Sequence, residues 1–235
     1  EPEEPDDVSF VVYNHLADSP DVNVSTVWEV TLSQNGVEKE CMVFQSTCPV
    51  YDPSKGMIGS DRTALELVAG RTISWANFSF DGEVTVTARI LDPSRVPMSS
   101  SVAVYPSRKH VSPSLSGQSV TFTLTEPGQY SVEVGAEGYR NGLMIFANPL
   151  EKDAPKSDDA AYRRVENATA ADMAALPADR SGIYFARGVH DIGKYIVPAH
   201  VKNIYIPGDA YVYGTLVVEN NPGVRIFGRG TLSAA

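Results

Sequence analysis

Residues 181–235 read SGIYFARGVH DIGKYIVPAH VKNIYIPGDA YVYGTLVVEN NPGVRIFGRG TLSAA. Three glycines, Gly188, Gly208 and Gly228, follow one another in this stretch at intervals of 20 residues. A short apolar run precedes each of them, at residues 183–185, 204–206 and 224–227. A second register agrees with the first, because Gly193 and Gly214 lie 21 residues apart and each leads into another apolar run.

Strands that alternate with glycine corners and repeat about every 20 residues are typical of a coiled parallel β-solenoid. Glycine suits the corners because it adopts positive φ without strain. Branched and aromatic side chains can then stack on their equivalents one coil away. A simpler alternative is three unrelated β-segments of one small sheet, and the two agreeing glycine registers favour the solenoid.

The predicted solenoid contains two full coils and the start of a third. Stacked repeats need roughly three or more units and a capped end to bury their core. A bare final coil would also expose unpaired backbone N–H and C=O groups. We therefore expect the rest of a β-helix to stack on residues 223–235, as a continuation of the polypeptide or as a second chain.

The composition of the 235 residues is that of a β-rich globular chain, with 43% hydrophobic and 20% charged residues, 18 Gly and 16 Pro. A formal net charge of −10 argues against a nucleic-acid partner, because no basic stripe is present to neutralise phosphates. No apolar run approaches the roughly 18 residues of a membrane-spanning helix. We interpret residues 1–7, EPEEPDD, as an acidic tail at the start of a mature exported chain, either secreted or at the cell surface or periplasm.

Two cysteines and three glycosylation sequons bear on export. Cys41 and Cys48 lie seven residues apart, beside Pro49. They could form a local disulfide or remain two free core thiols, and we predict the disulfide if the protein is exported. The sequons begin at Asn23, Asn77 and Asn167, and matter only in a eukaryotic host.

Residues 8–150 are predicted to form an antiparallel β-sandwich. Eight to ten short runs with β-strand character are separated by turn residues, as in residues 26–33, where side chains alternate between two faces. Asn35-Gly36 and Asp81-Gly82 are strong two-residue hairpin signals. No helical periodicity competes with the strands in this region.

Residues 151–180 are predicted to be a linker with a short capping helix. The first part, residues 151–159, is charged and contains Pro155. Residues 169–176 are the best helix former in the chain, with Thr169 as N-cap and Pro177 after the end. We expect this helix to cover the open first coil of the solenoid.

The sequence contains no recognisable catalytic or metal-binding pattern, so we predict no catalytic residue, no metal site and no cofactor for this chain. The four histidines lack metal-ligand spacing, and the glycine-rich residues 223–230 lack the lysine and hydroxyl of a phosphate loop. We interpret Asp158-Asp159 as a solvated charge run, His190-Asp191 as a surface corner, and Asp209 as a residue that stabilises its own turn. Tyr205, Tyr211 and Tyr213 are candidates for stacking on sugar rings, although those facing inward must be core residues.

Three segments resemble the front end of glycoside hydrolase family 49, which includes dextranases and isopullulanase. The first is residues 73–86, ISWANFSFDGEVTV, and the second is residues 143–150, LMIFANPL. The third comprises residues 182–190, 201–214 and 228–233, which read GIYFARGVH, VKNIYIPGDAYVYG and GRGTLS. The segments occur in the family's order along nearly the whole chain.

The resemblance implies a β-sandwich followed by a right-handed parallel β-helix, in an enzyme that hydrolyses an α-glucan with inversion. The family's catalytic aspartates lie on later coils, so no residue of this chain inherits that role. We therefore expect the chain alone to be inactive. The alternatives are a non-catalytic module for carbohydrate binding or assembly, and the front end of a polygalacturonase-like pectin hydrolase, whose β-helix begins similarly.

Overall fold

The computed structural model describes residues 8–16, 19–51, 65–96, 98, 101–135, 138 and 141–233, and for residues 47–51 and 65–71 the backbone alone. The predicted acidic tail at residues 1–7 therefore lies outside the described residues. The chain forms two compact units. The first comprises residues 1–12 and 22–150, and the second comprises residues 13–21 and 151–235.

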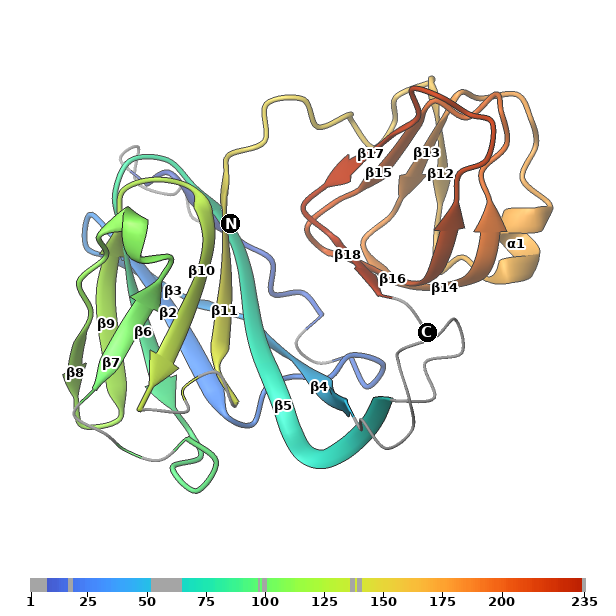
Figure 1. The fold of residues 1–235 in the computed structure, drawn as a ribbon. Coiled ribbons are helices and arrows are strands. Elements are labelled where there is room, and N and C mark those ends of the chain that lie inside the picture. The colour runs from blue at the N-terminus through green and yellow to red at the C-terminus, as the bar shows by residue number, and fades with distance from the viewer. Residues whose placement is uncertain are drawn as a thin grey trace. The chain divides into compact units, whose positions relative to one another are not determined.

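The first unit contains two β-sheets (Figure 1). The six strands of one sheet are β1 (Phe10–Val12), β4 (Val43–Tyr51), β5 (Leu65–Phe80), β7 (Val102–Tyr105), β10 (Gly128–Val134) and β11 (Leu143–Pro149). The five strands of the other are β2 (Trp28–Gln34), β3 (Val37–Cys41), β6 (Val84–Ile90), β8 (Ser114–Ser116) and β9 (Ser119–Leu124). A 3₁₀ turn, η2 (Ser107–Lys109), follows β7.

Both sheets contribute side chains to one hydrophobic core. Trp28 and Leu32 come from the five-stranded sheet, and Phe78, Phe80 and Ile145 come from the six-stranded sheet; all five are at most 1% exposed. The pairing is antiparallel except between β5 and β11, which run parallel. The predicted hairpin at Asn35-Gly36 joins β2 to β3, with φ of 51° and 81° as a type I′ turn requires.

The second unit is a parallel β-solenoid of about three turns, as the glycine spacing predicted. One sheet contains β12 (Tyr162–Val165), β13 (Gly182–Phe185), β15 (Asn203–Ile206) and β17 (Arg225–Gly228). The other contains β14 (Gly188–Ile196), β16 (Ala210–Val217) and β18 (Thr231–Ser233). The strand pairs described in these two sheets are all parallel, which confirms the predicted β-helix.

Equivalent side chains stack inside this solenoid from one coil to the next. Ile183 pairs with Ile204, and His190 pairs with Val212. Gly214 and Gly228 turn the corners with φ of +133° and +127°, where a Cβ atom would overlap a backbone carbonyl of the coil before. The side chain of Asn221 is buried and donates to the carbonyls of Pro198 and Val201 at 3.0 and 2.8 Å. These bonds satisfy backbone groups that the sheets leave unpaired.

The region predicted as a linker contains regular structure. Strand β12 adds a fourth strand to the first solenoid sheet, which sequence analysis did not predict. Helix α1 (Ala170–Ala174) begins after Thr169, as predicted, and Thr169 forms a reciprocal capping box with Asp172. Met173 places its side chain, which is 2% exposed, in the solenoid core, so the helix covers apolar side chains beside β14.

Cys41 is a free, buried thiol in this structure. The side chain of Cys48, its predicted partner in an exported protein, lies outside the described residues, so the disulfide stays a prediction. The burial pattern of β3 points Cys41 into the core of the first unit. There its sulfur lies 3.7 Å from the carbonyl oxygen of Asn77 and 3.8 Å from that of Met42. Burial raises the pKa of this thiol to about 12, so it is protonated at neutral pH.

Candidate functional site

The outward face of the sheet formed by β14, β16 and β18 presents polar and aromatic side chains in rows. Parallel register aligns Asp191, Tyr213 and Ser233 in one row. A second row, two residues earlier on each strand, contains Val189, Tyr211 and Thr231. Because side chains alternate along a strand, both rows point away from the core that contains His190 and Val212.

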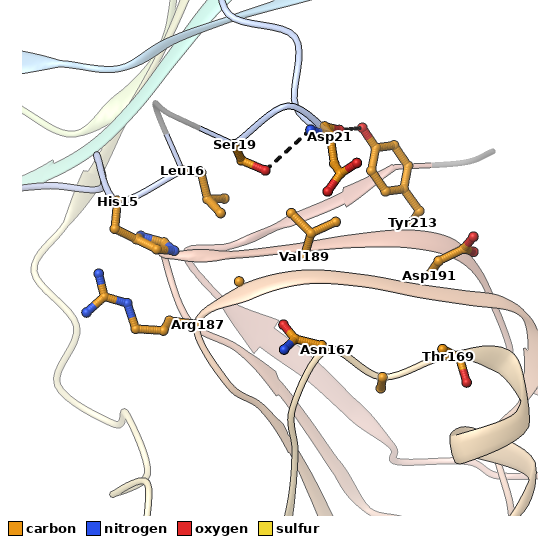
Figure 2. Close-up of a pocket in the computed structure, with 12 residues that line it drawn as sticks. His15, Leu16, Ser19, Asp21, Asn167, Thr169, Arg187, Val189, Asp191 and Tyr213 are labelled. Carbon is orange, nitrogen blue, oxygen red and sulfur yellow. Dashed lines mark hydrogen bonds between the residues drawn. The ribbon is translucent and has the colours of Figure 1, made fainter.

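A pocket of about 850 Å³ opens over these rows, and all of its lining residues belong to the second unit (Figure 2). Several side chains that line it are polar or charged and come from three separated parts of the chain. His15, Ser19 and Asp21 lie in the segment that precedes β2 in the chain. Asn167 and Thr169 precede α1, and Arg187, Asp191 and Tyr213 lie on or beside β14 and β16. Carboxylates, amides, hydroxyls and one aromatic ring are the groups that bind sugar hydroxyls and ring faces.

His15 is the most unusual of these side chains. Both ring nitrogens are buried, and neither makes a hydrogen bond to the residues that the structure describes. Burial lowers the pKa of His15, although nearby Asp209 opposes the shift. His15 is therefore neutral at pH 7, and the 3.8 Å contact between its Nδ1 and the Asp209 carboxylate is not an ion pair. Its free nitrogens can donate to or accept from a ligand hydroxyl.

Tyr213 forms the aromatic part of the pocket. Its hydroxyl donates to the backbone carbonyl of Asp21 at 2.6 Å, which holds the segment of residues 19–21 over β16. The ring lies 4.8 Å from that of Tyr211 at an interplanar angle of 46°. Tyr213 is partly exposed, whereas Tyr211 is 9% exposed, so only Tyr213 is placed to contact a ligand.

Tyr205, the third tyrosine predicted to stack on sugars, is not available for that role. It is 3% exposed and lies on the other solenoid sheet, in an aromatic column between Tyr184 and Phe227. Its hydroxyl donates to the carboxylate of Glu151 at 2.9 Å. Burial raises the pKa of Tyr205 far above its ordinary value, and Glu151 adds to the shift.

His190 and Asp191 have different environments. His190, predicted at a surface corner, is fully buried; its Nδ1 accepts from the N–H of Ala168 at 3.0 Å, and Nε2 donates to the carbonyl of Ala186 at 2.8 Å. Asp191 is exposed and lines the pocket. Asp209, predicted to stabilise its own turn, lies 3.8 Å from both His15 and Arg187.

The remaining candidate residues lie away from this pocket or at its rim. Asp158 and Asp159 are exposed, and Asp159 accepts from the N–H of Ala161 at 2.8 Å. Of the sequon residues, Asn23 and Asn167 are exposed, and Asn167 lines the pocket. Asn77 is half-buried within β5 and accepts from the amide of Asn148 at 2.7 Å, an arrangement that disfavours glycosylation.

Residues 13–21 fall within the β-sandwich predicted for residues 8–150, so His15, Ser19 and Asp21 were not predicted as site residues. The structure places this segment with the solenoid. Nothing in residues 13–21 carries a recognisable motif, because their role depends on a contact with strands almost 200 positions later. Only the three-dimensional fold could identify them.

No group of three or more potential metal ligands occurs among the described residues. Within the same part of the chain, each carboxyl group whose pKa is clearly shifted is lowered by a hydrogen-bonding partner. These are Glu29 beside Arg89, Asp92 beside Ser94, Asp172 beside Thr169 and Asp179 beside Arg163. A general acid requires the opposite shift. No helix in the described part is long and apolar enough to span a membrane.

Two known proteins are similar to this chain over nearly its whole length. The chain is 22% identical over 260 residues to a dextranase from Arthrobacter globiformis, an alignment covering 92% of this chain and 40% of that protein. Its structure is similar to Dex49A from Penicillium minioluteum, with a TM-score of 0.64, 17% identity, and coverage of 90% of this chain and 50% of that one. No protein-family model matches.

Both relatives confirm the resemblance to glycoside hydrolase family 49 inferred from the sequence. The structural likeness supports the fold, a unit of largely antiparallel sheets followed by a parallel β-helix. The chain spans half or less of the length of these two relatives.

Proposed function

We propose that this chain, which is similar over nearly its whole length to part of a dextranase, forms the first part of a secreted polysaccharide-degrading glycoside hydrolase. The proposed reaction is hydrolysis of an α-glucan, such as dextran or pullulan, with inversion at the anomeric carbon. The similarity to a dextranase and to Dex49A supports the enzyme class. Substrate, mechanism and export are parts of the proposal.

The observation that carries this proposal is the row of Asp191, Tyr213 and Ser233 on successive coils, under the pocket. Each further coil would extend the row by one side chain, about 4.8 Å along the solenoid axis. Equivalent side chains two coils apart are then about 9.6 Å apart, close to the upper end of the roughly 6.5–9.5 Å separation of the two carboxyl groups in inverting glycosidases. A row of this kind can therefore carry both the sugar-binding and the acid–base groups of one groove.

We place the two catalytic carboxylates on coils that stack beyond β17 and β18. Each carboxyl group of the described residues whose pKa is clearly shifted is lowered by a hydrogen-bonding partner, which is the direction opposite to that of a general acid. Ile226 and Leu232, on the last two strands, are 42% and 44% exposed and would be covered by such a coil. The pocket then serves as a subsite for glucose units distant from the cleaved bond.

The proposed subsite is tested by measuring, with calorimetry, the affinity of residues 1–235 for isomalto-oligosaccharides. Tyr213→Ala should weaken binding strongly, because it removes the ring that a sugar face would contact. Tyr213→Phe is the matched control, since it retains the ring and loses only the hydroxyl bonded to Asp21. Equal affinities of wild type and Tyr213→Ala would contradict the assignment.

The reaction itself is tested on the assembly that includes the later coils, with dextran, pullulan and pectin as substrates. We expect α-glucan hydrolysis with release of the inverted anomer, detected by NMR, and no hydrolysis by residues 1–235 alone. A retained anomer would rule out the inverting mechanism. Preferred cleavage of pectin would support the polygalacturonase-like alternative.

A second candidate function is a non-catalytic module that binds carbohydrate or assembles with a partner. It is favoured by one observation, that the pocket combines the aromatic ring of Tyr213 with hydroxyl, amide and carboxyl groups, a combination that suits sugar binding. Sugar binding without hydrolysis by the longest form of the protein would select this function.

A further inference from the structure

A second pocket, of about 320 Å³, lies at the other end of β14 and shares no lining residue with the first. This pocket is surrounded by helix α1 and the segment after it, by β12, by the beginning of β13, and by the end of β14 with the residues that follow it. All of its residues belong to the solenoid unit. Its size is at the lower end of the range for small-molecule sites.

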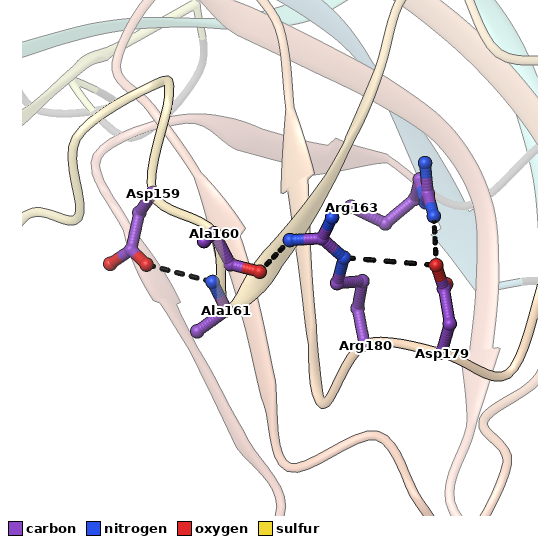
Figure 3. A network of polar contacts seen from close by, with 6 residues as sticks. All are labelled: Asp159, Ala160, Ala161, Arg163, Asp179 and Arg180. Carbon is purple, nitrogen blue, oxygen red and sulfur yellow. Dashed lines mark hydrogen bonds and ion pairs between the residues drawn. The ribbon is translucent and has the colours of Figure 1, made fainter.

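The basic residues of this pocket stand out in a chain of net charge −10. Arg163, Arg180, Lys194 and His200 line it, and no carboxylate does. Asp179, just outside, accepts from Arg163 at 2.5 Å and lies 3.7 Å from Nε of Arg180 (Figure 3). One carboxylate therefore faces two guanidinium groups, and Lys194 has no ion pair or hydrogen bond to any described residue. The pocket retains net positive charge.

Arg163 occupies a position where a β-helix normally has an apolar residue. In the parallel register Arg163 pairs with Ile183, and the same inward-facing row continues through Ile204 and Ile226 on the following coils. Its Nε is buried and makes no hydrogen bond within the described part of the chain. A guanidinium nitrogen desolvated without a partner costs folding free energy. Such a cost is expected where a ligand supplies the missing acceptor.

The rest of the pocket is apolar. Met173, Ile183 and Val201, each 2% exposed, lie beneath it. Ile196 also lines it and is 56% exposed, the largest exposed fraction among the large hydrophobic side chains of the described residues. An exposed isoleucine beside a cationic group is suited to a ligand that has an apolar body and an anionic head.

We propose that this pocket binds a small amphipathic carboxylate, with the carboxylate at Arg163 and Lys194 and the apolar body against Ile196. The site is independent of the proposed hydrolase function, because it uses different residues and needs no sugar. Arg163 contributes a directional N–H donor at Nε, and Lys194 contributes a mobile charge. Arg180 remains bonded to the carbonyl of Ala160 and helps to position Asp179.

Octanoate is the probe, added to residues 1–235 and followed by calorimetry and by methyl NMR. We expect saturable binding with shifts at the methyl groups of Met173, Ile183 and Ile196, and at least about tenfold weaker binding of 1-octanol, which lacks the charge. Lys194→Glu should weaken octanoate binding at least about tenfold. Lys152→Glu, an identical charge change at an exposed residue outside the pocket, should leave it unchanged.

Arg163→Met separates a binding role from a structural one, since methionine fits an apolar row. If Arg163 serves the ligand, this variant should lose octanoate binding and be as stable as wild type or more stable. Retained octanoate affinity in Arg163→Met and Lys194→Glu would overturn the proposal. So would methyl shifts confined to Ile226 and other residues of the last coil, because these would mark general apolar adsorption.

Discussion

The N–H of Ala168 donates to Nδ1 of His190 at 3.0 Å, and this bond joins the residue before the α1 cap to the inside of the solenoid. Nε2 of the same ring donates to the carbonyl of Ala186. The ring is therefore neutral with its proton on Nε2, since Nδ1 accepts. A protonated ring would have to break the bond with Ala168.

The buried position of His190 predicts loss of stability in mild acid. Burial lowers its pKa from the ordinary value of 6.5. Well above pH 6.5 the ring is neutral in both folded and unfolded chains, so it makes no pH-dependent contribution there. As the pH falls below 6.5 the unfolded chain takes up a proton that the folded chain resists, and the free energy of unfolding decreases. Urea titrations between pH 7.5 and 5 measure this decrease.

His190→Gln is the control for that experiment, because the amide cannot titrate in this range. Its free energy of unfolding should fall less steeply with acid than that of the wild type. The remaining slope is expected to include His15, whose pKa is also lowered. Identical slopes for both proteins would contradict the role of His190.

Thr169→Ala should destabilise the solenoid unit by about 1 kcal/mol, the usual cost of losing an N-cap side chain. Thr169 accepts from the N–H of Asp172 at 3.3 Å, and Asp172 in turn accepts from the N–H of Thr169 at 2.9 Å. Thr169→Ser retains the hydroxyl and should behave as wild type in urea denaturation. Equal stability of the alanine and serine variants would show that the capping box contributes little.

Gly214→Ala should destabilise the solenoid by about 2–4 kcal/mol, combining steric overlap with unfavourable φ. A Cβ atom there would overlap the carbonyl oxygen of Gly193 on the preceding coil. Gly223→Ala is the matched control, because its φ is +86° but nothing lies within 4 Å of the new atom. Gly223→Ala should therefore lower the free energy of unfolding by only about 1–2 kcal/mol, the cost of placing alanine at positive φ. Thermal unfolding would rank the two variants.

The thiol of Cys41 should be unreactive in the folded protein. Its raised pKa and its burial both limit attack, since the thiolate is the nucleophile. In Cys48→Ser, which leaves Cys41 as the single cysteine, we expect no reaction with a disulfide reagent at pH 8 until denaturant is added. Rapid labelling of the native variant would show that the core around Cys41 opens readily.

Trypsin should cut first at Lys152 or Lys156. Both are exposed and lie between Leu150 and β12, where the chain passes from the first unit to the second. Mass spectrometry of early fragments identifies the site. A first cut at Arg89, inside β6, would instead indicate that the five-stranded sheet opens more easily than the linker.

The sequence by itself determined the repeat. Glycines spaced 20 residues apart and the apolar runs between them predict parallel coils, because positive φ and side-chain alternation are local properties of the chain. The structure confirms this at Gly214 and Gly228, where the backbone of the preceding coil passes too close for a Cβ atom. The helix cap at Thr169 was likewise predictable, since its partner is three residues away.

Tertiary structure alone decided the candidate sites. His15 meets Asp209, and Tyr213 meets Asp21, across separations of almost 200 residues that no sequence period encodes. Arg163 could be recognised as an inward residue only after β12 was found to pair with β13. Whether a polar side chain is solvated or buried depends on which distant strand covers it. For the same reason Tyr205 and Tyr213, which look alike in sequence, are respectively buried and available to a ligand.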